Sequence, residues 1–182
     1  PAEQFSSGMG EVIKHGLIQD KAYYEWLKEH RDAVMARDLT TCRQMVFRSN
    51  EIKKAVVEKD PTEQGERAYL NFGHAVEKLK NFTMLHGHCV GLGCVAAARI
   101  SCLKGTLSET EADDIKHTMA SFELPTTVDG LIWKEVFDAT KSDKKMEAGK
   151  VKFVLLNGIG DAYVDHSLSE DEIRAGFEAV SL

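Results

Sequence analysis

The sequence predicts a mainly α-helical, bundle-like domain with one small β-hairpin. Apolar residues recur at three- and four-residue spacing through most of the chain, which is the period of an amphipathic helix. Only three prolines occur among 182 residues, so long stretches are free to be helical. Strand-like patterning is confined to residues 151–156 and 158–164, which we expect to pair as a hairpin.

Length and charge narrow the class of protein. A chain of 182 residues, 43% of them hydrophobic, is long enough for a single domain that buries roughly 70% of its unfolded surface. Its 23 basic and 29 acidic residues give a net charge of −6, which disfavours a general nucleic-acid or anionic-membrane binder. No apolar run approaches the roughly 18 residues of a membrane span. The four cysteines form no CxxC pair, which predicts a reduced, cytoplasmic protein.

Four helices are expected in the first half of the chain, at residues 3–19, 21–29, 40–59 and 66–81. Gly8, Gly10 and Gly16 interrupt the first of them. Because each glycine costs roughly 1 kcal/mol in a helix relative to alanine, the three indicate close backbone packing or the approach of a ligand. The third helix is expected to end at Pro61, which enforces a turn.

Four more helices are expected in the second half, at residues 86–103, from 108 onward, at 133–140 and from 169 to about 180. Residues 86–103 are apolar on most sides, which predicts a central buried helix. Ser108 with Glu111, and Ser169 with Glu172, have the spacing of a capping box, which marks the N-terminus of a helix.

Carboxylate and imidazole groups on these apolar helices form one candidate site. Glu11 lies on the glycine-rich first helix, His74 on the fourth, and His86 and His88 flank the start of the buried helix. Such a set can hold a divalent metal with an open position for substrate. No HExxH motif or cysteine pair accompanies these histidines, so capping or surface roles are the alternative interpretation.

Cationic side chains form a second candidate set. Lys14 lies three residues after Glu11, on the same helical face. Further basic residues could converge with it on a phosphate or carboxylate: Lys54, Arg67, Lys144 and Lys145. Taken singly, each is more often an ordinary solvated charge than a ligand-binding group. No glycine-rich phosphate loop follows a strand, so no Rossmann or P-loop nucleotide site is predicted.

Four sequence blocks resemble motifs of the 3-dehydroquinate synthase family. Residues 7–18 resemble GMAEVIKxGLI, and residues 54–74 resemble KxxVVxxDxxExGxRxxLNFGH. In the second block, Lys54 is separated from the first valine by one residue, where the motif has two. Residues 85–87 with the following helix resemble LHGExVxxG, and residues 143–160 resemble a DKK…GK…FVLL…IG tail. The blocks occur in family order, and together they are highly specific.

The resemblance implies that residues 1–182 are a single domain, the C-terminal domain of the dehydroquinate synthase-like fold. An N-terminal NAD-binding domain is then absent from this chain, which begins Pro-Ala-Glu without an initiator Met. The implied reaction converts a phosphorylated seven-carbon keto acid, DAHP, to 3-dehydroquinate with release of phosphate, in the shikimate pathway of aromatic amino acid biosynthesis. The implied cofactors are Zn²⁺ or Co²⁺ and NAD, the latter bound mainly by the absent domain. A homodimer is also implied, and the isolated chain is expected to fold without catalysing.

The resemblance also implies residue roles. The positions of the zinc ligands match Glu11, His74 and His86. The positions that bind the carboxylate, hydroxyls and phosphate of the substrate match Lys14, Lys54, Arg67, Asn71, Lys144 and Lys145, and either of the last two lysines could be the one that reaches the site.

Two departures from the family pattern bear on this site. The family motif is LNFGHTxGHAxE, whereas here His74 is followed directly by Ala75, so four residues and one histidine are absent. Removing four residues rotates a helical face by about 40° and shortens the helix by about 6 Å, so the helix can persist while His74 replaces only one of two histidines. His88 stands where the family has an acidic residue, and it could add an imidazole near the metal or disturb the site. We expect the fold to survive and metal or substrate binding to be weakened.

Two alternatives to the dehydroquinate branch remain. Another sugar-phosphate cyclase or a metal-dependent polyol dehydrogenase would share the architecture, although the anion-binding set of Lys14, Arg67 and Asn71 favours the dehydroquinate branch. A non-catalytic helical scaffold is the alternative from a different class. The missing histidine and the missing cofactor domain favour it.

Overall fold

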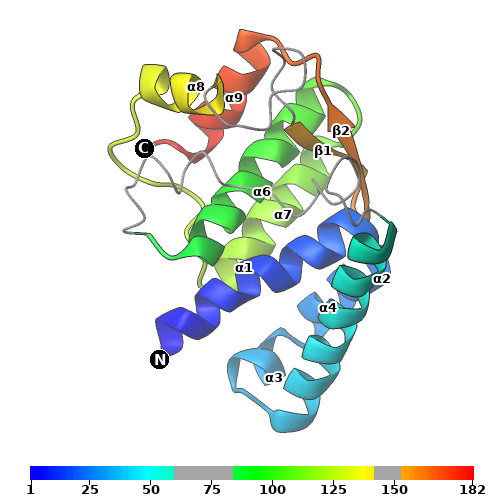
Figure 1. Cartoon of the computed structure of the whole chain (residues 1–182). Coiled ribbons are helices and arrows are strands. Elements are labelled where there is room, and N and C mark those ends of the chain that lie inside the picture. Colours follow the sequence, from blue (N-terminus) through cyan, green and yellow to red (C-terminus); the bar gives the residue numbers. More distant parts are fainter. Residues whose placement is uncertain (60–83, 142–152) are drawn as a thin grey trace.

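The buried helix α6 (His86–Leu103) forms the centre of the computed structural model, which describes residues 1–59, 84–141 and 153–182 (Figure 1). It packs against α1 (Ala2–Gln19), α7 (Glu109–Ser121), α9 (Glu170–Val180) and strand β1 (Phe153–Gly158). Elements therefore cover α6 on several sides, which confirms the prediction made from its apolar composition. Among the described residues, every helix is too short or too polar to cross a bilayer.

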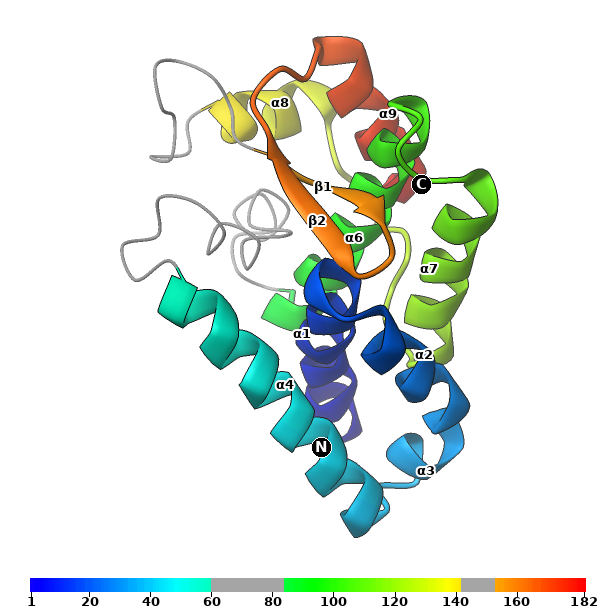
Figure 2. The same ribbon diagram turned by 90° about the vertical axis from the view of Figure 1, so that its right-hand side faces the viewer.

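The N-terminal helices follow the predicted order with one addition. After α1 come α2 (Lys21–Glu29), the five-residue α3 (Arg31–Met35) and α4 (Leu39–Lys59). Helix α3 is not predicted, because a single turn and a half is too short to have a measurable hydrophobic period. In Figure 2, α4 runs obliquely beside α1. Asp20 joins these helices, since its side chain accepts a hydrogen bond from the Tyr23 backbone N–H (3.0 Å) and pairs with Arg48 of α4.

The remaining helices begin where the sequence predicts. Ser108 and Ser169 each accept a hydrogen bond from the backbone of the residue three positions on, and both capping boxes are complete. Helix α8 spans Trp133–Lys141, one residue longer than predicted. The predicted helix at 66–81 and the turn at Pro61 lie outside the described residues.

The predicted hairpin is confirmed as an antiparallel pair of β1 with β2 (Asp161–Asp165). Its turn contains Gly160 at φ +89°, and the backbone N–H of this glycine donates to the Leu17 carbonyl at 2.8 Å. A Cβ atom at Gly160 would lie 2.4 Å from the backbone nitrogen of Lys21, so both the positive φ and the close approach require glycine. The hairpin is therefore fastened to the C-terminal end of α1.

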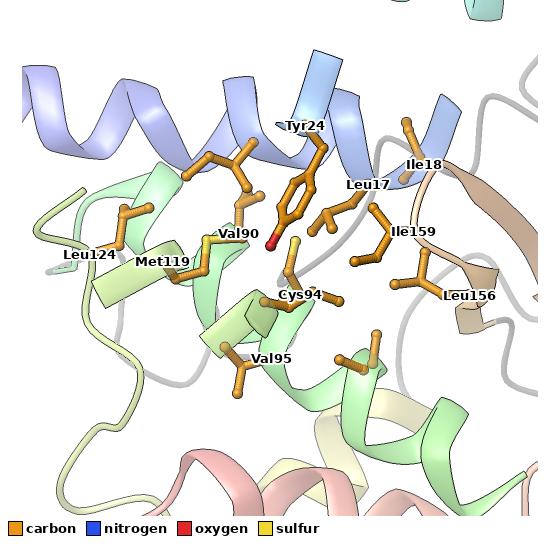
Figure 3. Packing of buried hydrophobic residues seen from close by; sticks show 14 of the residues in the cluster. Leu17, Ile18, Tyr24, Val90, Cys94, Val95, Met119, Leu124, Leu156 and Ile159 are labelled. Atoms are coloured by element: carbon orange, nitrogen blue, oxygen red, sulfur yellow. The ribbon is translucent and has the colours of Figure 1, made fainter. Parts of the chain in front are cut away.

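The hydrophobic core lies between α1, α6, α7 and the hairpin. Figure 3 shows Tyr24 extending from α2 toward Val90 and Cys94 of α6. Its buried hydroxyl hydrogen-bonds Asp114 Oδ2 and Thr118 Oγ1, both at 2.8 Å, so the polar end of this large side chain is satisfied inside the core. The core therefore joins α2 to α7 as well as to α6.

Asp165 at the end of β2 supports a pH-dependent prediction. It is buried and accepts hydrogen bonds from the Ser167 backbone N–H (2.6 Å) and hydroxyl (2.8 Å), and Lys104 Nζ lies 3.1 Å away. Burial raises the pKa of Asp165, but Ser167 and Lys104 lower it more, so the net pKa lies below its ordinary value.

We expect Asp165→Asn to lower the free energy of unfolding by about 1–2 kcal/mol at neutral pH. A carboxylate with a depressed pKa stabilises the fold above its unfolded-state pKa, and this contribution is lost as the pH falls through the folded-state pKa. The difference between variant and wild type should therefore shrink in acid. Urea unfolding at neutral and acidic pH measures it, with the exposed Asp161→Asn as the control. An equal difference at both pH values would contradict the prediction.

Candidate metal and substrate site

Helix α1 places Glu11 and Lys14 one turn apart on the same face, as their spacing predicts. The Lys14 side chain is only 1% exposed, and its Nζ forms an ion pair with Glu11 Oε2. Because an ammonium group is costly to bury, the carboxylate beside it helps to make this position tolerable. Lys14 is therefore a buried charge held in an ion pair on α1, and it is not a solvated surface charge.

His86 joins this pair from a distant part of the sequence. It is the first residue of α6, and its Nε2 lies 3.1 Å from Glu11 Oε1. The two oxygens of one carboxylate thus face two different groups, Lys14 on its own helix and an imidazole from another. The His86 side chain is half exposed and Glu11 is one-third exposed, so the cluster opens to solvent on one side.

Two glycine positions allow α1 and α6 to approach closely enough to form this cluster. The Gly87 backbone N–H donates to Ser7 Oγ at 3.1 Å. A Cβ atom at Gly87 would lie 1.7 Å from the Ser7 carbonyl oxygen, and one at Gly10 would lie 2.1 Å from the Gly87 carbonyl oxygen. The backbones therefore touch directly, one residue away from both Glu11 and His86.

The other two glycines of α1, Gly8 and Gly16, differ in the space around an added Cβ atom. At Gly16 an added Cβ would lie 3.0 Å from Tyr24 Cα, so the prediction of close packing is confirmed at Gly10 and Gly16. At Gly8 the same atom would meet nothing within 4 Å among the described residues, so close packing does not account for this glycine, and the approach of a ligand there stays a prediction. Gly8 lies on the exposed side of α1, and its conformational freedom has no packing role there.

The electrostatics of the cluster keep Glu11 ionised. Burial by itself raises the pKa of Glu11, but Lys14, His15 and His86 lower it, and the net pKa falls below its ordinary value. A deprotonated carboxylate is the form that binds a metal cation. Glu11 is therefore prepared to act as an anionic ligand at neutral pH.

The donor atoms of Glu11 and His86 fit a divalent metal. Two atoms bound at 2.0–2.1 Å to one tetrahedral zinc lie roughly 3.3 Å apart, close to the 3.1 Å between Glu11 Oε1 and His86 Nε2. Among residues 1–59, 84–141 and 153–182, no group of three His, Cys, Asp or Glu side chains is placed to hold a metal. The described part of the chain thus offers two ligands, and His88 does not complete a third with them.

His88 and His15 have environments different from that of His86. Burial lowers the pKa of His88, Glu3 is its charged neighbour, and its Nε2 has no hydrogen-bond partner among the residues that the structure describes. Burial and then the charge of Lys14 lower the pKa of His15 to about 4, so this imidazole is neutral. Neither histidine lies against Glu11 as His86 does.

One of the described residues predicted for the site, Lys54, is not brought to this cluster. Lys54 lies on α4 with its side chain 72% exposed, and it pairs with Glu58 at 3.7 Å. Its neighbour Lys53 is the lysine of α4 whose charge acts on His15. Counted back from Val56 and Val57, the lysine of the KxxVV pattern falls on Lys53. The spacing of the motif therefore pointed to Lys53 in place of Lys54. Five predicted site residues lie outside the described residues: Arg67, Asn71, His74, Lys144 and Lys145.

Sequence comparisons match this chain to one family. The family model for the 3-dehydroquinate synthase C-terminal domain matches residues 8–146. A 3-dehydroquinate synthase from Syntrophotalea carbinolica is 39% identical over 168 residues, which are 90% of this chain and 46% of that protein. One from Dichelobacter nodosus is 36% identical over 181 residues, 96% of this chain and 49% of that protein. The chain spans about half the length of these curated relatives.

Solved structures share the fold at low sequence identity. A 2-epi-5-epi-valiolone synthase from Streptomyces hygroscopicus subsp. jinggangensis 5008, with NAD⁺ and Zn²⁺ bound, matches 98% of this chain and 51% of its own with a TM-score of 0.88 at 21% identity. A 2-deoxy-scyllo-inosose synthase complexed with carbaglucose-6-phosphate, NAD⁺ and Co²⁺ matches 99% of this chain and 53% of its own with a TM-score of 0.82 at 16% identity. The predicted dehydroquinate synthase-like fold is thereby confirmed.

Proposed function

The chain belongs to the 3-dehydroquinate synthase family, and from this we propose that it is the metal- and substrate-binding half of such an enzyme. The reaction would convert DAHP to 3-dehydroquinate with release of phosphate. A separate NAD-binding domain would complete the active site. The observation that carries the proposal is the buried Lys14, whose ammonium group is held by a carboxylate that also faces His86.

Each residue of the cluster has a role that follows from its surroundings. Glu11 and His86 would hold a divalent cation, Zn²⁺ or Co²⁺, together with His74 as the third ligand. When bound, the metal would supply Lewis-acid polarisation of a substrate hydroxyl or carbonyl. The neighbours' bound Zn²⁺ and Co²⁺ support a divalent metal for this fold.

Lys14 would bind the anionic part of the substrate. Its ammonium group is paired with Glu11 Oε2, while Oε1 of the same carboxylate lies 3.1 Å from His86 Nε2, where the two groups would hold the metal. A cation that is already desolvated and oriented stabilises developing negative charge without reorganising. Lys14 would therefore favour the departure of phosphate, supported by cations that lie outside the described residues: Arg67, Lys144 and Lys145.

A related sugar-phosphate cyclase is the second candidate, because the two solved structures described above are synthases of that kind. Those structures are at most 21% identical, whereas curated 3-dehydroquinate synthases reach 39%. The balance favours the dehydroquinate substrate. A cytoplasmic location and a homodimer are further parts of the proposal.

Reconstitution tests the proposed function. The chain is mixed with the part of the Dichelobacter nodosus relative that it does not match, together with NAD, Zn²⁺ and DAHP, and phosphate release is followed. We expect the chain alone to be inactive, the mixture to release phosphate, and Lys14→Ala to lower the rate at least about 100-fold.

The exposed Lys134→Ala is the matched control and should keep the rate of the wild type. Circular dichroism establishes that both variants fold. Phosphate release that is equal in the Lys14 and Lys134 variants would contradict the role of Lys14. Failure of every mixture to release phosphate would favour the scaffold interpretation.

A further inference from the structure

The N-terminus of α6 is capped by a side chain from another helix. Its own N-cap residue is Leu85, whose side chain cannot accept a hydrogen bond. The backbone N–H of Gly87, the second residue of α6, donates to Ser7 Oγ of α1 at 3.1 Å. A serine at the N-cap satisfies such an N–H within its own helix, as Ser108 and Ser169 do in α7 and α9. For α6, a residue 80 positions away takes the place of the local cap.

The same two helices meet at a second point, one turn further along α1. Glu11 lies four residues after Ser7, so both side chains lie on the same face of α1. Glu11 Oε1 lies 3.1 Å from His86 Nε2, and His86 is the neighbour of Gly87 on α6. The hydrogen bond to Ser7 therefore holds the backbone of α6 directly beside the residue whose ring reaches Glu11.

Burial makes the hydroxyl of Ser7 difficult to replace. Ser7 and Gly87 are both buried, and so is the hydrogen bond between them, whereas the His86 side chain is half exposed. If the hydroxyl is removed, the Gly87 N–H is left in the interior without its acceptor, which is unfavourable. The first turn of α6 can hydrate this N–H only by moving toward solvent. We expect that movement to carry His86 away from Glu11.

We propose that Ser7 is a positioning residue of the metal site. By accepting the Gly87 N–H, it holds the first turn of α6, and with it His86, against Glu11. Ser7 would act on the metal only through His86 and would not bind the metal itself. The proposal rests on the proposed role of Glu11 and His86 as metal ligands. Loss of a residue that only orients a ligand typically lowers metal affinity by roughly 10–100-fold.

Titration calorimetry of the metal-free chain with Zn²⁺ tests the proposal. Ser7→Ala should raise the dissociation constant at least about tenfold. Ser6→Ala is the matched control, because it removes the same atom from the adjacent residue. The Ser6 hydroxyl is also buried, but it donates to the Glu123 carbonyl at 2.8 Å, in the segment that follows α7. This variant loses a comparable hydrogen bond and should leave the zinc dissociation constant unchanged.

Cobalt gives a readout that a purely structural role of Ser7 would not change. At saturating Co²⁺ every metal site is filled, so the visible absorption spectrum reports the coordination geometry and not the affinity. Ser7→Ala should shift the absorption bands, because His86 then approaches the metal from a displaced backbone, and Ser6→Ala should give the spectrum of the wild type. Zinc dissociation constants that are equal in Ser7→Ala and the wild type, or raised equally by both substitutions, would overturn the positioning role.

Glu11→Gln separates this proposal from the proposed function. If Glu11→Gln weakens zinc binding and Ser7→Ala does not, the ligand assignment stands and the role of Ser7 is overturned. If neither substitution weakens zinc binding, the ligand assignment fails and the role of Ser7 fails with it. Circular dichroism and urea unfolding of each variant establish that the chain is folded under the conditions of the titration.

Discussion

Gly87→Ala should lower the free energy of unfolding by about 3 kcal/mol, because the added methyl group has no space at the crossing of α1 and α6. Its carbon would lie 1.7 Å from the Ser7 carbonyl oxygen, and backbone atoms cannot move aside as a flexible side chain can. The helices must separate, which also breaks the hydrogen bond from the Gly87 N–H to Ser7 Oγ. Urea unfolding followed by circular dichroism measures the loss.

Gly8→Ala is the matched control for this substitution. It adds the same methyl group to a helical glycine, but at a position with nothing within 4 Å. Alanine is a better helix former than glycine, so we expect this variant to be more stable than the wild type by about 0.5–1 kcal/mol. If Gly87→Ala lowers the free energy of unfolding and Gly8→Ala raises it, the loss in Gly87→Ala comes from the contact between α1 and α6. A loss of stability below about 1 kcal/mol in Gly87→Ala would contradict the direct backbone contact.

Glu11→Gln should lower the affinity of the chain for Zn²⁺ at least about 100-fold. Loss of a group that merely orients a ligand already costs 10–100-fold, and Glu11 is proposed as a ligand itself. The amide keeps the size of the side chain while removing the negative charge that faces both Lys14 and His86. Titration calorimetry of the metal-free chain with Zn²⁺ measures the affinity without any catalytic assay.

Glu3→Gln provides the control for the zinc titration. It removes one negative charge from the same helix at an exposed position, and it should leave the zinc affinity unchanged. Equal affinities of the wild type and Glu11→Gln would contradict the assignment of Glu11. The wild type itself tests the weakened-site hypothesis, because tight, stoichiometric zinc binding would mean that the four-residue gap after His74 has not cost a ligand.

Much of the fold follows from local patterns in the sequence. The central helix α6 was predictable because its residues are apolar on most sides, and such a helix is stable only when it is surrounded. The two capping boxes were predictable because the Ser and Glu residues that form them are three positions apart. Helix α3 was missed because it lacks a second turn on which a period could be recognised.

The candidate site was predictable in part: contacts between residues close in the sequence were predictable, and contacts between distant residues were not. Glu11 and Lys14 lie one helical turn apart, so the sequence alone predicts that they are neighbours. Lys54 is predicted to bind substrate; in the structure both Lys53 and Lys54 are exposed, Lys54 pairs with Glu58, and the charge of Lys53 is the one that acts on His15. A shift of one residue rotates a side chain by about 100° around a helix, and only the packing of α4 on α1 fixes that rotation.

The sequence by itself determined the helical architecture, the hairpin, the family and the local pairing of Glu11 with Lys14. These depend on residues that are close along the chain or on motifs in a fixed order. Only the tertiary structure decided that His86, 75 residues away, faces the second oxygen of Glu11. It also decided that Gly10 and Gly16 serve packing while Gly8 does not. The reason is physical: a contact between helices depends on how closely their backbones approach. A local sequence pattern does not specify which helix faces will pack against each other.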